Sequence, residues 1–205
     1  MQTVNVSAKK DNFSQRNNEV RPLSSCNTTS LTMATSYLPY LWDKFLASPT
    51  NVLYKHFKQP EDRLQQALLD WGLEPTNHYQ LMEGYNRFIG ANIDHFSTCV
   101  SFKDLIGDLL EGIPWVGSGT FPGYPKAEKK PLGHIVCVVG MEYETDPYHP
   151  ENMIIDDPYG NTMNNWIGSG NDVRIPFDFF VDWMKPVKDP KIFWAHRFIW
   201  TAKSQ

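Results

Sequence analysis

The residues with the clearest potential for chemistry are a cysteine, a histidine and a carboxylate, which follow one another in that order along the chain. Cys26 stands where a polar segment turns into an apolar-periodic helix. The unpaired N–H groups and partial positive charge of a helix N-terminus lower the pKa of a thiol and favour the nucleophilic thiolate. Cysteine-based nucleophilic chemistry is therefore the first hypothesis.

A cysteine nucleophile needs an imidazole as its base, and His134 is the candidate. It lies at the entrance of residues 133–140, whose continuous apolar run predicts a buried strand. A second predicted strand, 152–155, runs into Asp156 and Asp157, which places a carboxylate where a strand meets a turn. A carboxylate at that point could accept the other ring N–H of His134 and fix its tautomer.

Strand geometry limits the alternatives within this set. Because side chains alternate across a regular strand, only one of Asp156 and Asp157 can face His134. A bulge at the end of the strand would exchange the sides that the two aspartates face. The same alternation places Cys137 on the opposite side of the sheet from His134, as a core residue. Cys99 has no helix start near it and is also interpreted as a packing residue.

The elements that must position these residues are indicated by periodicity and capping. Helices are predicted over 31–46, where Pro39 kinks or divides the helix, and over 61–72, 78–88, 102–110 and 177–183. Further strands are predicted from 113 to 117 and from 192 to 201. Helices thus come first and an antiparallel sheet follows, which predicts an α+β fold.

Composition bounds the size and the class of the protein. The chain has 205 residues, of which 41% are hydrophobic and 14% aromatic, enough to bury a full core. We expect a single domain over residues 1–205, with a helical half at about 24–111 and a sheet half at about 112–205. A net charge of −4 and a pI near 5.8 give no electrostatic footprint for nucleic acid. Three cysteines, an odd number at wide spacings, argue against a disulfide framework and for a reducing compartment.

The sequence does not indicate a metal, a cofactor or a membrane. Its six histidines show neither helical i, i+4 pairing nor the Cys/His spacing of metal sites, so no metal and no cofactor are expected. No apolar run reaches the roughly 18 residues that span a bilayer, and the N-terminal residues lack the pattern of a signal peptide. We therefore expect no membrane partner, and a protein that is cytoplasmic or exported without an encoded signal peptide.

Short motifs spread over most of the chain together resemble a known family. They are Gln15, Cys26 with Thr29-Ser30-Leu31 and Met33-Ala34, Glu111-Gly112-Ile113-Pro114, Gly133-His134 with Val139-Gly140, and Asp157-Pro158. From Gln15 to about Trp183 the chain resembles the bacteriocin-leader (C-thirty-nine-like) family of papain-like cysteine peptidases. The resemblance implies a papain-like fold, in which an N-terminal helical part packs on a C-terminal antiparallel sheet.

The resemblance also implies a role for each matching residue. Cys26 would attack a carbonyl carbon, and His134 would take the thiol proton and later protonate the leaving group. Asp157 would orient His134, because the family pattern places its acid directly before a proline. Gln15 would donate from its side-chain amide to the developing oxyanion, although it precedes Cys26 by a longer spacing than a compact papain-type loop uses.

The substrate is expected to be a peptide or a protein. A loop rich in Pro and Lys, residues 119–132, precedes His134 and would border a cleft around it, and Tyr124 in this loop is the residue that we expect to contact substrate. Some members of the family cut after Gly-Gly leaders, and freestanding domains of this kind occur in bacteria and their phages. Neither a phosphate-binding loop for ATP nor a membrane span accompanies the motifs here.

Three functional classes follow from these residues. The first is a cysteine peptidase that hydrolyses a peptide or isopeptide bond. The second is an acyltransferase that forms the same thioester and passes the acyl group to another amine or thiol. The third is a catalytically silent binding protein on the same fold, since a fold does not fix a function.

Overall fold

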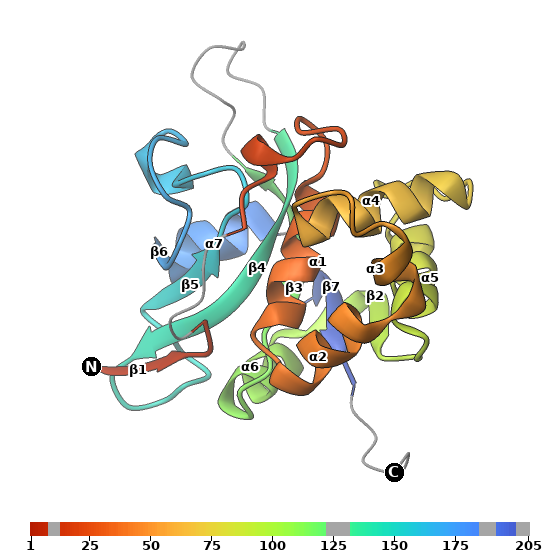
Figure 1. Cartoon of the computed structure of the whole chain (residues 1–205). Helices are drawn as coiled ribbons and strands as arrows, with labels where there is room; N and C mark the ends of the chain where they lie inside the picture. The colour runs from red at the N-terminus through yellow and green to blue at the C-terminus, as the bar shows by residue number, and fades with distance from the viewer. Residues whose placement is uncertain (8–12, 122–131, 185–191, 200–205) are drawn as a thin grey trace.

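The computed structural model describes residues 1–7, 13–121, 132–184 and 192–199 (Figure 1). The α-helices in these ranges are α1 (Cys26–Ser36), α2 (Pro39–Ala47), α3 (Pro49–Leu53), α4 (Pro60–Asp70), α5 (His78–Ile89), α6 (Phe102–Leu110) and α7 (Phe177–Met184). The strands are β1 (Gln2–Asn5), β2 (Asp94–Ser101), β3 (Trp115–Phe121), β4 (Leu132–Tyr143), β5 (Asn152–Asp156), β6 (Val173–Pro176) and β7 (Ile192–Phe198). Two short 3₁₀ helices, η1 (Gln15–Asn17) and η2 (Thr162–Asn164), lie in the connections.

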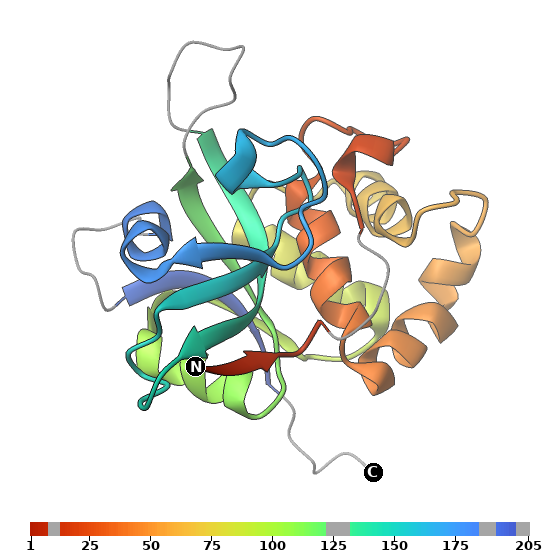
Figure 2. The same cartoon turned by 90° about the vertical axis from the view of Figure 1, so that its left-hand side faces the viewer.

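The strands form one antiparallel sheet, whose order is β2-β7-β3-β4-β5-β6, with β1 paired to β4 (Figure 2). Strand β4 pairs with β3 along its first half and with β1 along its second half. The approach of β1 requires a glycine at position 140, because a Cβ there would lie only 2.1 Å from the carbonyl oxygen of Val4. Strand β4 is thus fixed along its whole length, including the end that carries His134.

Helices cover both faces of the sheet, and each face has its own apolar core. Helices α1, α2, α4 and α5 pack with Ile135, Cys137 and Val139 of β4. Helices α6 and α7 pack with the alternate residues of that strand, Val136 and Val138. The alternation expected of a strand buried on both faces is therefore present, and Cys137 lies in the core on the α1 side.

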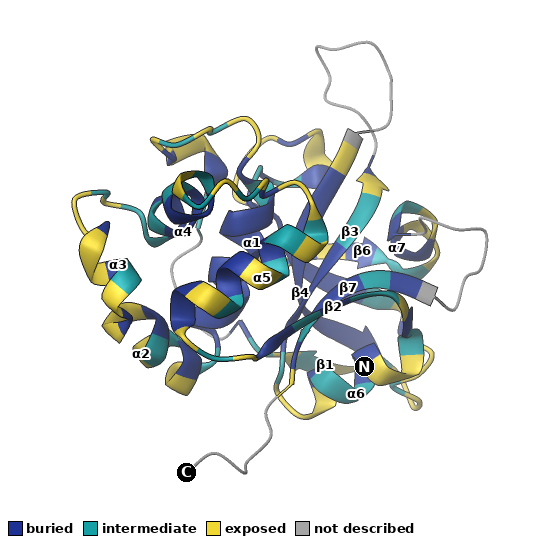
Figure 3. Ribbon diagram, turned by 90° about the vertical axis from the view of Figure 1, so that its right-hand side faces the viewer, coloured by how far each residue is buried: buried dark blue, intermediate teal, exposed yellow. Residues whose placement is uncertain are grey.

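Helix α1 is buried on every side, as Figure 3 shows by its dark ribbon at the centre of the molecule. A helix in this position would usually be apolar, yet α1 carries hydroxyl groups that find partners inside the protein. Ser30 donates to the carbonyl oxygen of Ile135 on β4 at 3.0 Å, and Thr28 donates to Gln65 on α4 at 2.8 Å. Small hydroxyl side chains such as Ser30 and Thr28 therefore let α1 lie close against β4 and α4, although the hydroxyl of Thr32 has no partner among the described residues.

Most of the predicted elements are present, and the α+β class is confirmed. Pro39 divides the first predicted helix into two, since it occupies the first position of α2. Ser101 caps α6 by accepting from the backbone N–H of Asp104. The predicted order, in which helices come first and the sheet follows, does not hold for β1, which precedes α1, or for β2, which lies between α5 and α6. Helix α3 and strand β6 were not predicted.

Strand β2 also corrects the prediction for Cys99. This residue is exposed rather than packed. The pairing of β2 with β7 shifts register between Ser97 and Val100, which interrupts the alternation of inward and outward side chains around Cys99. Cys99 therefore contributes no packing to the core.

The helices that the structure describes are all too short or too polar to cross a bilayer.

Candidate active site

Cys26 is the first residue of α1, at the edge of the sheet where β4 begins. Its side chain is half-buried, and its Sγ lies 3.2 Å from Oδ1 of Asn27. Ser25 occupies the N-cap position, but its side chain makes no capping hydrogen bond. The N–H groups in the first turn of a helix have no partner within the helix, so they are available to stabilise negative charge beside the thiol.

His134 is held between a carboxylate and two aromatic rings. Its Nε2 lies 2.8 Å from Oδ1 of Asp157, which directly follows β5. The rings of Phe121 and Trp166 contact the imidazole edge-on, with centroids 5.3 and 5.0 Å away, and leave His134 only 5% exposed. This arrangement fixes the plane of the imidazole and leaves Nδ1 as the ring nitrogen available to Cys26.

The electrostatics of His134 favour its protonated form. Burial lowers the pKa of an imidazole, but here the negative charge of Asp157, its hydrogen bond and the nearby Cys26 thiol together outweigh burial and raise the pKa of His134 to about 10. The Cys26 side chain contributes through its hydrogen bond to His134 and, as a thiolate, through its negative charge. The geometry and the charges therefore suit a thiolate–imidazolium pair.

The two neighbouring aspartates have different partners in the structure. The carboxylate that contacts His134 is that of Asp157, which also accepts from the backbone N–H of Tyr159 at 2.8 Å. Asp156 instead accepts from the hydroxyl of Tyr37 and from the backbone N–H of Asp172. Burial, which the hydrogen bond from Tyr37 only partly offsets, raises the pKa of Asp156 to about 6. Asp156 thus connects the end of β5 to Tyr37, which directly follows α1, and to the backbone of Asp172, and it does not contact His134.

Gln15 lies in η1, directly beside the segment that follows β5. Its backbone N–H donates to the carbonyl oxygen of Pro158 at 3.0 Å, and its side-chain Nε2 donates to the carbonyl oxygen of Pro22 at 3.1 Å. The side chain is 2% exposed, and its Oε1 finds no partner among the described residues. One amide hydrogen of Gln15 is thus occupied by Pro22, which leaves the second for another acceptor.

The long connection between Gln15 and Cys26 is fixed by residues that the sequence did not single out. Asp62, in the first turn of α4, accepts from the backbone N–H groups of Glu19 and Val20 at 2.8 and 2.9 Å. The Asn18 amide accepts from the hydroxyls of Ser25 and Thr29 in the orientation that satisfies all of its partners. Only the position of Asp62 in a first helical turn was visible in the sequence, and that position is common to many helices.

Gln15, Cys26 and His134 line one cavity of about 580 Å³. The rest of the lining comes from α1 and the loop before it, from α5 and the loop before it, from β3 and β4, and from the segment after β5. These residues are Leu23, Ser24, Asn27, Thr76, His78, Ser118, Gly133, Ile135 and Tyr159. A smaller apolar pocket of about 250 Å³ lies at the start of α2 and contains none of the predicted site residues. Tyr124, the predicted substrate contact, lies outside the described residues.

Sequence and fold comparisons extend this description. The model of the Peptidase_C39 like family matches residues 8–172. No curated protein matches the chain significantly. The crystal structure of a candidate C39-like peptidase from Bacillus anthracis has the same fold, with a TM-score of 0.59 and 15% sequence identity over 99% of this chain and 100% of that chain. Because the family model covers most of its length, this chain belongs to the C39-like peptidase family.

Proposed function

We propose that the protein is a cysteine peptidase that hydrolyses a peptide or isopeptide bond. The observation that carries the proposal is the arrangement around His134, which contacts Asp157 through Nε2 at 2.8 Å while the Cys26 thiol interacts with the same imidazole. A nucleophile, a base and a group that orients the base are the parts that thiol-based acyl transfer needs. Family membership supports the same class of reaction.

In the first half of the proposed reaction, the Cys26 thiolate attacks the carbonyl carbon of the scissile bond. The carbonyl π electrons move to oxygen, and a tetrahedral intermediate forms. This intermediate collapses as the C–N bond breaks, and His134 gives its proton to the departing amine. The product of this half is a thioester between Cys26 and the acyl part of the substrate.

In the second half, neutral His134 takes a proton from a water molecule, whose oxygen attacks the thioester carbonyl. The C–S bond then breaks, a carboxylic acid leaves, and the proton returns to the Cys26–His134 pair. Throughout, Asp157 keeps the imidazole in one orientation and stabilises its charged form.

The oxyanion of both tetrahedral intermediates needs donors that are already in place. We assign this role to the free side-chain N–H of Gln15 and to the backbone N–H of Cys26 in the first turn of α1. Both residues line the cavity, and Gln15 is held by its own backbone contact to Pro158. Removal of one such donor typically costs about 10²–10³ in kcat.

The test is cleavage of a diverse peptide mixture, followed by mass spectrometry of the products. We expect cleavage by the wild type and by Cys99→Ala, which removes an exposed cysteine outside the cavity lining. Cys26→Ala should cleave at least about 10³-fold more slowly than the wild type, as other enzymes do when their nucleophile is removed. Cleavage by Cys26→Ala at the wild-type rate would refute the proposal.

The products of the same experiment separate hydrolysis from acyl transfer. With an added amine such as glycinamide, a hydrolase should still release mainly the free carboxylic acid. A product that carries the amine in place of water, with little free acid, would reassign the protein to the acyltransferase class. Neither product, together with an unreactive Cys26, would favour a binding protein.

A further inference from the structure

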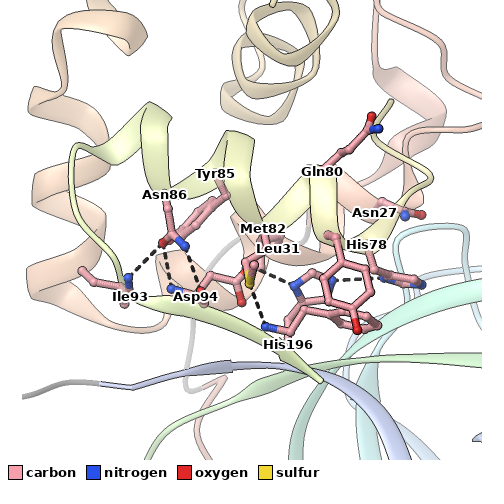
Figure 4. A network of polar contacts seen from close by, with 12 residues as sticks. Asn27, Leu31, His78, Gln80, Met82, Tyr85, Asn86, Ile93, Asp94 and His196 are labelled. Atoms are coloured by element: carbon pink, nitrogen blue, oxygen red, sulfur yellow. Dashed lines mark hydrogen bonds and ion pairs between the residues drawn. The ribbon is translucent and has the colours of Figure 1, made fainter. Parts of the chain in front are cut away.

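A second chain of buried polar side chains ends at the cavity that contains Cys26. Asp94 of β2 and His196 of β7 are fully buried, and Oδ2 of the aspartate lies 2.8 Å from Nδ1 of the histidine. Nε2 of His196 lies 3.1 Å from Nδ1 of His78, the first residue of α5. Figure 4 shows this chain running from Asp94 through His196 to His78. His78 lines the cavity together with Cys26 and Asn27.

The ring of His78 is held in a single plane. It stacks on Phe96, with centroids 4.6 Å apart and planes 8° from parallel. Trp194 contacts the same ring edge-on at 6.1 Å. Because Nδ1 is directed at the buried His196, the other ring nitrogen, Nε2, is the polar atom that His78 can offer to the cavity.

Neither packing nor a metal accounts for this chain. A buried carboxylate costs free energy, and apolar residues of similar volume would stabilise the core at least as well. Oδ1 of Asp94 even lacks a partner among the described residues. No three metal-ligating side chains in the described part of the chain cluster as an ion would require. His78, the member of the chain that lines the cavity, has a strongly lowered pKa, and a titratable group of this kind in a cleft is a candidate for a functional residue.

The carboxylate of Asp94 can only accept, so it fixes the direction of the first hydrogen bond in this chain. Burial, and then the nearby His196, lower the pKa of His78 to about 4, so this imidazole is neutral near pH 7. A neutral imidazole has one donor and one acceptor nitrogen. Asp94 accepts from Nδ1–H of His196, and an Nε2 of His196 that carries no proton accepts from Nδ1–H of His78. Nε2 of His78 is then left with a free lone pair.

We propose that His78 is a substrate-binding residue, whose Nε2 accepts a hydrogen bond from a main-chain N–H of the peptide bound in the cavity. Asp94 and His196 act through it as positioning residues, because they fix its tautomer and its orientation. This inference rests on the proposed peptidase function and adds to it the group by which the cavity recognises a peptide main chain.

The test uses N-acetyl dipeptidyl vinyl sulfones, which react covalently with a thiolate after the peptide part has bound. From a series of such compounds, the one that inactivates the wild type fastest is selected. His78→Phe keeps a ring on Phe96 but has no acceptor, and we expect it to react about 3- to 10-fold more slowly, the value of one neutral hydrogen bond. His149→Phe, the same change at an exposed histidine outside the cavity lining, should react as the wild type does.

A depsipeptide version of the selected compound, in which one amide N–H is replaced by an ester oxygen, identifies the bond itself. At the position that contacts His78, the wild type should lose about 3- to 10-fold in rate and His78→Phe should lose nothing further. The proposal is overturned if His78→Phe retains the full rate, or if every ester replacement costs both proteins equally. It is also overturned if no peptide compound reacts faster with the wild type than methyl vinyl sulfone does.

A parallel reaction with iodoacetamide keeps this inference distinct from the proposed function. Iodoacetamide has no peptide to recognise, so His78→Phe should be alkylated at Cys26 within about twofold of the wild-type rate. If His134→Ala fails to change that alkylation rate, the proposed Cys26–His134 pair is wrong. If His134→Ala changes the alkylation rate but His78→Phe reacts with the peptide compounds as fast as the wild type does, the Cys26–His134 pair is supported and the proposed role of His78 is wrong.

Discussion

Replacement of Asp157 by Asn should lower the pKa of His134 sharply while keeping the shape of the site. The Asn Oδ1 can still accept from the backbone N–H of Tyr159 and from His134, which Asp157 contacts at 2.8 and 2.8 Å. Only the charge is lost. Two charges about 4 Å apart interact with about 4 kcal/mol at an effective dielectric constant of about 20, which corresponds to about 3 pKa units.

The expected pKa of His134 in Asp157→Asn is therefore about 7, compared with about 10 in the wild type. At about pH 8 the imidazolium fraction would fall from about 99% to about 10%. The measurement is an NMR titration of protein labelled at the histidine ring carbons, in which the signal absent from His134→Gln identifies His134.

The matched control is Asp156→Asn, which removes the neighbouring carboxylate. Asp156 contacts Tyr37 and Asp172 and makes no contact with His134, so the His134 titration should stay near that of the wild type. The reasoning fails if Asp157→Asn leaves the His134 titration in place. It also fails if Asp156→Asn shifts that titration as far as Asp157→Asn does.

Three further predictions concern stability and are measured by urea denaturation. Asp62→Ala should lower the free energy of unfolding by about 2–4 kcal/mol, because two backbone N–H groups before α1 lose a charged acceptor. An unchanged unfolding midpoint would show that the Asp62 carboxylate does not stabilise the loop before α1. Gly140→Ala should cost at least about 2 kcal/mol, because its Cβ would lie 2.1 Å from a carbonyl oxygen of β1. The control is Gly107→Ala within α6, where a Cβ would meet no atom within 4 Å; this change should stabilise the folded protein by about 0.5–1 kcal/mol. Equal effects of the two substitutions would contradict the close approach of β1 to Gly140. Asp156→Asn should be more stable than the wild type by about 2–3 kcal/mol above about pH 7, because burial raises the pKa of Asp156 to about 6 and the folded state resists its ionisation. This difference should vanish below about pH 4, where the carboxyl is protonated in both states, and a difference that grows on acidification would reverse the sign of the argument.

Local patterns account for the elements that the sequence predicted well. Helix α6 combines apolar periodicity with a serine cap and a following glycine at position 112 with φ of +80°, all within one short stretch of chain. Strand β4 is a continuous apolar run, and its two faces supply two different cores. Signals of this kind depend only on near neighbours, so they are visible without the fold.

The elements that were missed depend on partners far away in the sequence. Strand β2 begins with a buried aspartate, Asp94, whose carboxylate has the side chain of His196 on the neighbouring strand β7 as its partner. When its partner is unknown, a polar residue at the first position of a strand predicts a loop. His78 was likewise visible only as the start of a helix, because its connection to the cavity passes through His196.

The place of β7 in the sheet has a consequence for when the cavity around Cys26 can form during synthesis. Strand β7 lies between β2 and β3, so β2 joins the rest of the sheet only after β7 has been made. At about 5–20 residues per second, the ribosome adds the segment from α1 to β7 in about 10–30 s. Cys26 is therefore made early, yet its reactive surroundings assemble late. The cavity around Cys26 is complete only after β7 has been made, because His196 of β7 contacts His78 in the cavity lining. In the proposed peptidase, this topology would delay cleavage until the chain has folded.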